Sequence, residues 1–227
     1  MTTGFFITFE GIDGAGKSSH IQPTAELLKA AGYDVVVTRE PGGTPLAEKI
    51  RALVLNDAMD PMTEALLVFA ARRDHIQTVI RPALAAGKIV LSDRFTDSTW
   101  AYQGYGRGFN HDVLSRLEDW VQRDHLGPAA GGDLLQPDAT FLYDLDPAIA
   151  ARRLAGAREP DRFESEKADF FAKVREGYLM RMVANRGRFY RLDASLTQEE
   201  VWNDVRDAVG SMILADQIVN RNAEKVA

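Results

Sequence analysis

The sequence predicts an α/β fold of three layers, in which a five-stranded parallel sheet lies between two layers of helices. Two observations indicate this architecture. Short apolar runs rich in β-branched and aromatic residues recur along the chain, and segments with helical periodicity separate them. This alternation is typical of β-α-β units, whose right-handed crossovers place helices on both faces of a parallel sheet. The expected strands cover residues 5–10, 33–38, 88–93, 140–145 and 188–192.

The expected elements can be justified in chain order. The first strand is nearly all apolar, as in a strand that is buried on both faces. A helix is expected over 18–31, although Pro23 lacks a backbone N–H and predicts a kink or a late start. A long helical segment rich in alanine and leucine spans 63–86. Thr197 begins a capping-box pattern ahead of the last helix.

A chain of 227 residues can bury one sizeable core, so we expect one domain. This domain is expected over residues 1–214. Residues 127–137 are rich in turn formers and predict a surface loop. Residues 215–227 are expected to form a loosely ordered tail. The strands of a parallel sheet end along one edge, so the loops that follow them are expected to carry the chemistry.

Composition excludes several kinds of site. The chain has no cysteine, which excludes disulfides and thiolate sites and fits a reducing cytoplasm. No secretory signal is visible, and the longest apolar stretch, 65–71, is too short to cross a bilayer, so a soluble cytoplasmic protein without a membrane partner is expected. A net charge of −6 argues against a general nucleic-acid binder. Any anionic ligand must therefore be held by locally concentrated arginines.

One glycine-rich stretch predicts a phosphate site. It reads FEGIDGAGKSS, and Gly11 is followed after four residues by Gly16, Lys17 and Ser18. This spacing is that of a phosphate-binding loop, whose backbone N–H groups point at one anion. An apolar strand precedes it and a helix follows, as that loop requires. The residues expected to bind ATP are Gly11, Ile12, Asp13, Gly14, Ala15, Gly16, Lys17, Ser18 and Ser19.

A phosphate-binding loop alone leaves a small-molecule kinase, a nucleotide-dependent switch and a mechanical ATPase open. We find no Asn-Lys-x-Asp guanine reader, which argues against a GTP switch. Asp93 and Arg94 follow the strand 88–93, so they are expected at the sheet edge beside the loop. Asp93 and the hydroxyl of Ser18 suit Mg²⁺, which prefers oxygen ligands, and Arg94 can grip a second phosphate group. A structural ion pair at a strand end is the alternative reading.

The chain closely resembles the bacterial thymidylate kinases through five segments in a fixed order, FEGIDGAGKSS, TREPGGT, DRF, STWAYQG and DRFE. The resemblance covers about residues 6–205. It implies a fold of the P-loop kinase type with a small helical lid, and ATP-dependent phosphorylation of dTMP to dTDP in dTTP synthesis. It also implies Mg²⁺ as cofactor and a cytoplasmic homodimer. A kinase of another nucleoside monophosphate or of a deoxynucleoside, and a non-enzymatic nucleotide-binding regulator, are the alternatives.

The expected base pocket begins on one helix face. Phe69 and Arg73 are four residues apart and share that face, so the ring could stack on a pyrimidine and the guanidinium could donate to its O4, as the resemblance implies. Arg72 points about 100° away, and no substrate role is assigned to it. A core phenylalanine with a surface arginine is the alternative reading for this pair.

The segment STWAYQG supplies further pocket candidates. Helical spacing places Thr99 on the same side as Tyr102 and Gln103, and all three could line a nucleoside pocket. By resemblance, Tyr102 packs where a ribose 2′-hydroxyl would lie and so selects deoxyribose; a structural tyrosine is the alternative. Glu40 and Pro41 are expected to form another wall.

The reaction implied by the resemblance needs charge neutralisation more than a general base, because the acceptor phosphate is already nucleophilic. Lys17 and Arg94 are expected to neutralise the transferring group, and by resemblance Asp13 positions the acceptor. No histidine has an evident role. The lid is expected at about 151–164, where catalytic cations could come from Arg153, Arg158 and Arg162. Arginine at 158 and alanine at 155 and 157 depart from common bacterial lids, and solvated arginines on an exposed helix are the alternative.

Overall fold

The computed structural model describes residues 4–123, 132–155 and 161–226, with the backbone alone for 216–226. Within these ranges one five-stranded sheet forms, in the order β2-β3-β1-β4-β5. Every neighbouring pair is parallel, which confirms the predicted sheet. The strands are β1 (Phe5–Glu10), β2 (Val35–Arg39), β3 (Ile89–Asp93), β4 (Ala139–Asp144) and β5 (Phe189–Asp193).

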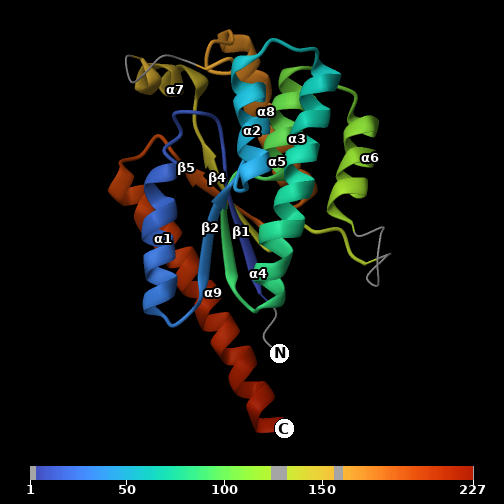
Figure 1. Cartoon of the computed structure of the whole chain (residues 1–227). Helices are drawn as coiled ribbons and strands as arrows, with labels where there is room; N and C mark the ends of the chain where they lie inside the picture. Colours follow the sequence, from blue (N-terminus) through green and yellow to red (C-terminus); the bar gives the residue numbers. More distant parts are fainter. Residues whose placement is uncertain (1–3, 124–131, 156–160, 227) are drawn as a thin grey trace.

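Helices cover both faces of the sheet, as predicted. Helices α1 and α9 pack together on one side, and α3, α4 and α6 lie on the other (Figure 1). Helices α2, α7 and α8 gather beyond the carboxyl ends of the strands (Figure 1). The described helices are α1 (Ser18–Ala30), α2 (Pro45–Asn56), α3 (Pro61–His75), η1 (Ile76–Ile80), α4 (Arg81–Ala85), α5 (Thr96–Thr99), η2 (Trp100–Gly106), α6 (His111–Gln122), α7 (Pro147–Leu154), α8 (Ala168–Ala184) and α9 (Gln198–Val226), where η1 and η2 are π-helical.

The core lies between the sheet and these helices. Phe9 of β1 and Phe141 of β4 are fully buried, and their ring centroids lie 5.5 Å apart. The central strand β1 is buried along almost its whole length because β3 and β4 flank it and helices cover both faces. The register pairs Phe9 with Asp93, so the phosphate-binding loop and the loop after β3 leave the sheet side by side.

Several predicted boundaries differ from the structure. The long helix expected over 63–86 starts earlier, at Pro61, because Asp60 caps its N-terminus, and a π-helical turn interrupts it. Pro23 neither delays nor ends α1, which runs from Ser18 to Ala30. Thr197 and Glu200 exchange the two hydrogen bonds of the predicted capping box.

Two predicted irregular segments have different outcomes. Helix α9 continues to Val226, through most of the segment expected as a tail. Part of the expected loop 127–137 lies outside the described residues, and its remaining residues, 132–137, form neither helix nor strand.

Candidate functional site

The phosphate-binding loop connects β1 to α1, as the sequence predicts. Gly11 has a φ of 137°, and a Cβ atom there would lie 2.5 Å from the carbonyl oxygen of Tyr143, so only glycine fits. Lys17 curls back over the loop, and its Nζ donates to the carbonyl oxygens of Gly11 at 2.9 Å and Ile12 at 3.0 Å. The loop therefore holds an ammonium group where an anion would bind.

Lys17 is a buried cation with a second cation, Arg94, nearby. Its side chain is 6% exposed. Burial and the nearby charge of Arg94 lower the pKa of Lys17 to about 8. A bound phosphate would raise this pKa, because a nearby negative charge favours the charged form of the lysine.

Ser18 and Asp93, the predicted metal ligands, lie side by side. The Ser18 hydroxyl donates to Oδ2 of Asp93 at 3.3 Å. Oδ1 of Asp93 is buried and has no hydrogen-bond partner among the described residues. A carboxylate oxygen without a partner beside a hydroxyl fits Mg²⁺, which binds one or two protein oxygens and completes its shell with phosphates and water. The described part of the chain holds no cluster of three or more histidine, aspartate or glutamate side chains suited to a metal.

Arg94 links the phosphate-binding loop to α8. Its backbone has a φ of 70°, unusual for a residue with a side chain, and such strain is often found at functional sites. Its Nη1 donates to the carbonyl oxygen of Gly11 at 2.8 Å and to the hydroxyl of Tyr178 at 2.8 Å, and its Nη2 donates to Oδ1 of Asp13 at 2.6 Å. The sequence placed Arg94 at this edge, and the structure brings it to the loop.

Asp13 and Tyr102 complete the group around Arg94. The Tyr102 hydroxyl donates to Oδ2 of Asp13 at 2.7 Å and accepts from Nη2 of Arg94 at 3.2 Å. Burial by itself raises the pKa of Asp13, but the charges of Arg94 and Lys17 outweigh it and hold this pKa well below its usual range. Asp13 is therefore an anion, and it orients both the arginine and the tyrosine.

Glu10, at the end of β1, is a buried group that sequence reasoning missed. Burial, followed by the charge of Asp97, raises the pKa of Glu10 to about 7. Its carboxyl oxygens accept from the backbone N–H of Phe95 at 2.7 Å and from the Ser98 hydroxyl at 2.6 Å. Glu10 thereby fixes the start of α5, which carries Thr99 into the site. An acidic residue inside an otherwise apolar strand was the signal available in the sequence.

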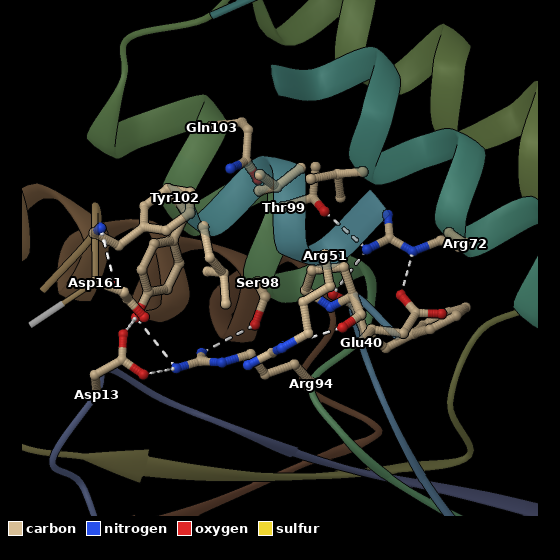
Figure 2. A pocket seen from close by; sticks show the side chains of 16 residues that line it. Asp13, Glu40, Arg51, Arg72, Arg94, Ser98, Thr99, Tyr102, Gln103 and Asp161 are labelled. Carbon is tan, nitrogen blue, oxygen red and sulfur yellow. Dashed lines mark hydrogen bonds and ion pairs between the residues drawn. The ribbon is translucent and has the colours of Figure 1, made fainter. Parts of the chain in front are cut away.

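A cavity opens between the phosphate-binding loop, α2, α3, η2 and the segment after α7. Figure 2 shows the Asp13–Arg94–Tyr102 group on one side of it and the Glu40–Arg72–Thr99 group on the other. The lining combines six arginine or acidic side chains with apolar walls and hydroxyl groups. These residues are Asp13, Glu40, Pro41, Arg51, Val54, Leu55, Val68, Arg72, Arg94, Phe95, Ser98, Thr99, Tyr102, Gln103, Asp161 and Phe163.

The structure places two neighbouring arginines differently from the sequence expectation, with Arg72 and not Arg73 at the cavity. Arg72 lines the cavity, and its Nε donates to Oε2 of Glu40 at 2.7 Å while its Nη2 donates to Thr99 Oγ1 at 2.8 Å. Nη1 of Arg72 is buried and lacks a hydrogen-bond partner among the described residues. Arg73 instead donates through Nη1 to the carbonyl oxygen of Val121 on α6, 3.0 Å away, and does not line the cavity.

Phe69 also differs from its expected place. It is 2% exposed and packs in a core cluster with Ala65 and Leu114. Val68, one residue earlier, lines the cavity instead. Because one residue turns the helix by about 100°, the face directed at the cavity is that of Val68 and Arg72.

Gln103 lines the cavity as predicted, but it belongs to a network that the sequence did not reveal. Its Nε2 donates to Oε1 of Glu64, a residue 1% exposed on α3, at 2.7 Å. Arg162 donates to the other oxygen of Glu64 and to the carbonyl oxygen of Val54. Arg162 is therefore tied to α2 and α3 and is not directed at the phosphate-binding loop.

Of the other two expected lid cations, Arg153 and Arg158, the structure describes only the first. Arg153 is exposed near the end of α7. Arg158 lies outside the described residues. In the described part of the chain, the basic side chains that line the cavity are Arg51, Arg72 and Arg94.

Arg51, from α2, is a cavity residue that sequence reasoning missed. Its Nη1 donates to the carbonyl oxygen of Pro41 at 2.9 Å. Burial and the charges of Arg39 and Arg94 lower the pKa of Arg51. Two arginines of like charge, Arg51 and Arg94, thus line one cavity, which favours a bound anion.

None of the described helices combines the length and apolar character that crossing a membrane requires.

Comparisons with known proteins agree with this geometry. The family model described as thymidylate kinase matches residues 9–205. The thymidylate kinase of Albidiferax ferrireducens is 61% identical over 212 residues, covering 92% of this chain and 97% of that protein. The thymidylate kinase of Paracidovorax citrulli is 58% identical, covering 87% and 89%. A crystal structure of thymidylate kinase from Ehrlichia chaffeensis superposes with a TM-score of 0.71 at 33% identity and covers 91% of this chain and 99% of its own. The chain belongs to the thymidylate kinase family.

Proposed function

We propose that this protein transfers the γ-phosphoryl group of ATP to dTMP, giving dTDP and ADP in the synthesis of dTTP. One observation carries the proposal. The phosphate-binding loop and the cavity meet at Arg94, which lines the cavity and donates both to Gly11 of the loop and to the hydroxyl of Tyr102 on η2. Family membership supports ATP and dTMP as the two substrates, one on each side of Arg94.

The residues supply alignment and charge. The acceptor phosphate is already anionic and nucleophilic, so repulsion between anions is the main barrier. Lys17 exchanges its bonds to the loop carbonyls for ATP oxygens, and Arg94 neutralises charge between the two nucleotides. Asp13 keeps Arg94 and Tyr102 in place while they do so.

Mg²⁺ is the proposed cofactor. Ser18 and Asp93 would hold it, and it neutralises negative charge on the ATP phosphates. Oδ1 of Asp93, which has no hydrogen-bond partner in the described part of the chain, supports this assignment.

The cavity is proposed as the dTMP site. Arg51 and Arg94 suit the acceptor phosphate, and Tyr102 suits the deoxyribose. Arg72, in place of the expected Arg73, suits a carbonyl oxygen of the base, because its buried Nη1 lacks an acceptor among the described residues. The other proposed contacts, retained from the sequence, are Glu40, Pro41, Thr99 and Gln103.

We also propose that α7 and the residues after it form a lid. Arg153 and Arg158 are the cations it would deliver to the transferring group, and closure would exclude water. Arg162 anchors the end of this segment through Glu64.

A cytoplasmic homodimer is proposed as the working form. Leu46 and Leu53 of α2, and Met62 and Leu66 of α3, are large exposed apolar side chains on two helices that pack together. A second copy of this chain would cover them. Light scattering should give twice the chain mass, and Leu66→Glu should shift it to the monomer mass; a monomeric wild type contradicts this proposal.

Transfer of label from [γ-³²P]ATP to dTMP tests the proposed activity. With Mg²⁺ present, labelled dTDP should form in proportion to enzyme, and omission of dTMP should abolish the labelled product. Label found only in inorganic phosphate would mean transfer to water and contradict dTMP as the acceptor, and label retained in ATP would favour a nucleotide-binding regulator.

A further inference from the structure

A buried histidine stands behind the arginine that lines the base side of the cavity. His75 is 0% exposed and lies at the end of α3. Its Nδ1 lies 2.9 Å from Oε1 of Glu40, and its Nε2 lies 2.6 Å from the Thr38 hydroxyl on β2. The second oxygen of Glu40 accepts from Nε of Arg72. A chain of hydrogen bonds thus runs from β2 through His75 and Glu40 to Arg72.

We propose that His75 is a positioning residue for recognition of the acceptor base, acting through Glu40 on Arg72. This inference rests on the proposed function, because it assigns Arg72 to the base. His75 does not line the cavity, so its effect must pass through Glu40.

The protonation of the chain follows from Glu40. Burial by itself raises the pKa of Glu40, but the charge of Arg72 and the contact with His75 lower it below its usual range. An ionised carboxylate only accepts hydrogen bonds, so Nδ1 of His75 carries a proton and donates to Oε1. One oxygen of Glu40 then belongs to His75 and the other to Arg72, and the carboxylate cannot rotate without breaking both bonds.

The fixed rotamer of Glu40 determines where the guanidinium lies. Arg72 is held at Nε by Glu40 and at Nη2 by Thr99 and the carbonyl oxygen of Phe95. These bonds fix the plane of the guanidinium and therefore the direction of Nη1. Loss of the histidine bond would leave Glu40 free to turn and would loosen Arg72.

The second glycine of the TREPGGT segment gives independent support. Gly43 has a φ of 83°, and a Cβ atom there would lie 2.5 Å from Thr38 Oγ1 and 2.6 Å from His75 Nε2. The loop after β2 therefore packs its bare backbone directly against this pair. The segment that carries Glu40 therefore also packs closely against His75 through Gly43.

Two substitutions of His75 test the contacts of its two ring nitrogens separately. The amide nitrogen of asparagine occupies the place of Nδ1, so His75→Asn retains the bond to Glu40 and loses the bond to Thr38. The end of a glutamine side chain reaches the place of Nε2, so His75→Gln retains the contact with Thr38 and loses the bond to Glu40. Both variants remove the ring, which makes each the control for the other.

Steady-state kinetics with the full-length enzyme tests the inference. His75→Gln should raise the KM for dTMP by about tenfold and leave the KM for ATP unchanged, as expected when a hydrogen bond to a charged group is lost. His75→Asn should stay close to the wild type. The preference for dTMP over 5-methyl-dCMP, which differs where a base carbonyl becomes an amino group, should fall in His75→Gln alone.

Thr38→Val provides a second test that keeps the histidine. The imidazole loses its partner at Nε2 but keeps its bond to Glu40, so the KM values for dTMP and ATP should both stay close to those of the wild type, as in His75→Asn. Thr78→Val is the matched control for the loss of a threonine hydroxyl, because the Thr78 side chain is exposed and its hydroxyl donates to the carbonyl oxygen of Asp74, four residues earlier.

The outcomes separate this inference from the proposed function. Turnover of dTMP by the wild type is measured first, and its absence would contradict the proposed function itself. If the wild type turns over dTMP but His75→Gln and His75→Asn behave alike, or Thr38→Val raises the KM for dTMP as much as His75→Gln does, the positioning role is overturned.

Discussion

Arg72 and Arg73 are adjacent in the chain, yet their guanidinium groups lie on different sides of α3 and have different hydrogen-bond partners. Arg72 donates to Glu40 at 2.7 Å inside the cavity wall, whereas Arg73 donates to the backbone of Val121 at 3.0 Å on the side of α6. The difference follows from the turn of about 100° between successive helical residues. The first arginine of the pair is therefore the one we propose to contact the base.

Substitution of each arginine by lysine tests this assignment. Arg72→Lys keeps a positive charge near Glu40 but loses the planar set of donors, so the KM for dTMP should rise by roughly tenfold with little change for ATP. Arg73→Lys is the matched control and should leave both constants near the wild type. An effect on dTMP confined to Arg73→Lys would restore the interpretation made from the sequence.

Tyr102 has two separable functions in the site. Its hydroxyl holds Asp13 and Arg94, and its ring lines the cavity. Tyr102→Phe should lower kcat because Asp13 and Arg94 lose a partner, while the preference for dTMP over ribothymidine monophosphate stays constant. Tyr102→Leu removes the ring and should lower that preference. An unchanged preference in Tyr102→Leu would remove Tyr102 from sugar selection.

The lowered pKa of Lys17 predicts proton uptake on ATP binding. Free Lys17 has a pKa of about 8, and bound phosphates raise it again because they favour the ammonium form. Binding therefore takes up a proton above pH 8, and ATP affinity should fall by up to about tenfold per pH unit there. Calorimetry between pH 8 and pH 9.5, in buffers of different ionisation enthalpy, measures both effects.

Two variants control the titration. Lys17→Arg should bind without proton uptake, because arginine stays charged over this range. Lys29→Met, at an exposed residue in the last turn of α1, should retain the wild-type slope. Uptake that persists in Lys17→Arg would assign the proton to another group.

Substitution of Arg153 should affect kcat, whereas substitution of Arg162 should affect stability. Arg153→Ala should lower kcat without changing the melting temperature, because Arg153 is exposed on α7, and its exposed neighbour Arg152 provides the matched control. Arg162→Ala should lower the free energy of unfolding by roughly 1–3 kcal/mol, because the buried Glu64 loses a partner. Thermal unfolding and kinetics on the same samples distinguish them. A stable Arg162→Ala variant with a large loss of kcat would make Arg162 a catalytic cation.

The sheet and the phosphate-binding loop were predictable because both depend on local patterns. Alternating apolar runs and helical segments specify a parallel sheet, and the spacing from Gly11 to Ser18 specifies the loop. The strand ends then bring Asp93 and Arg94 to that loop, as expected from the topology. Each of these steps needs only the order of elements along the chain.

The side chains of the cavity were less predictable because they depend on tertiary partners. Helical spacing shows that Arg72 and Arg73 face different ways, but only the approach of Glu40 from the loop after β2 decides which one faces the cavity. Arg162 likewise looked like a free lid cation until α3 placed Glu64 beside it. Glu10 and His75, both buried among partners distant in sequence, gave no periodic signal.

The central proposal is that this site phosphorylates dTMP and reads its base. The most direct measurement is Mg²⁺- and ATP-dependent ADP release with dTMP, dUMP, dCMP, AMP, thymidine or no acceptor, compared as kcat/KM. Strong turnover with dTMP, weak turnover with dUMP and none above background with the others is the expected result. A preference for AMP or thymidine would leave the phosphate-binding loop in place and contradict the assignment of the cavity to dTMP.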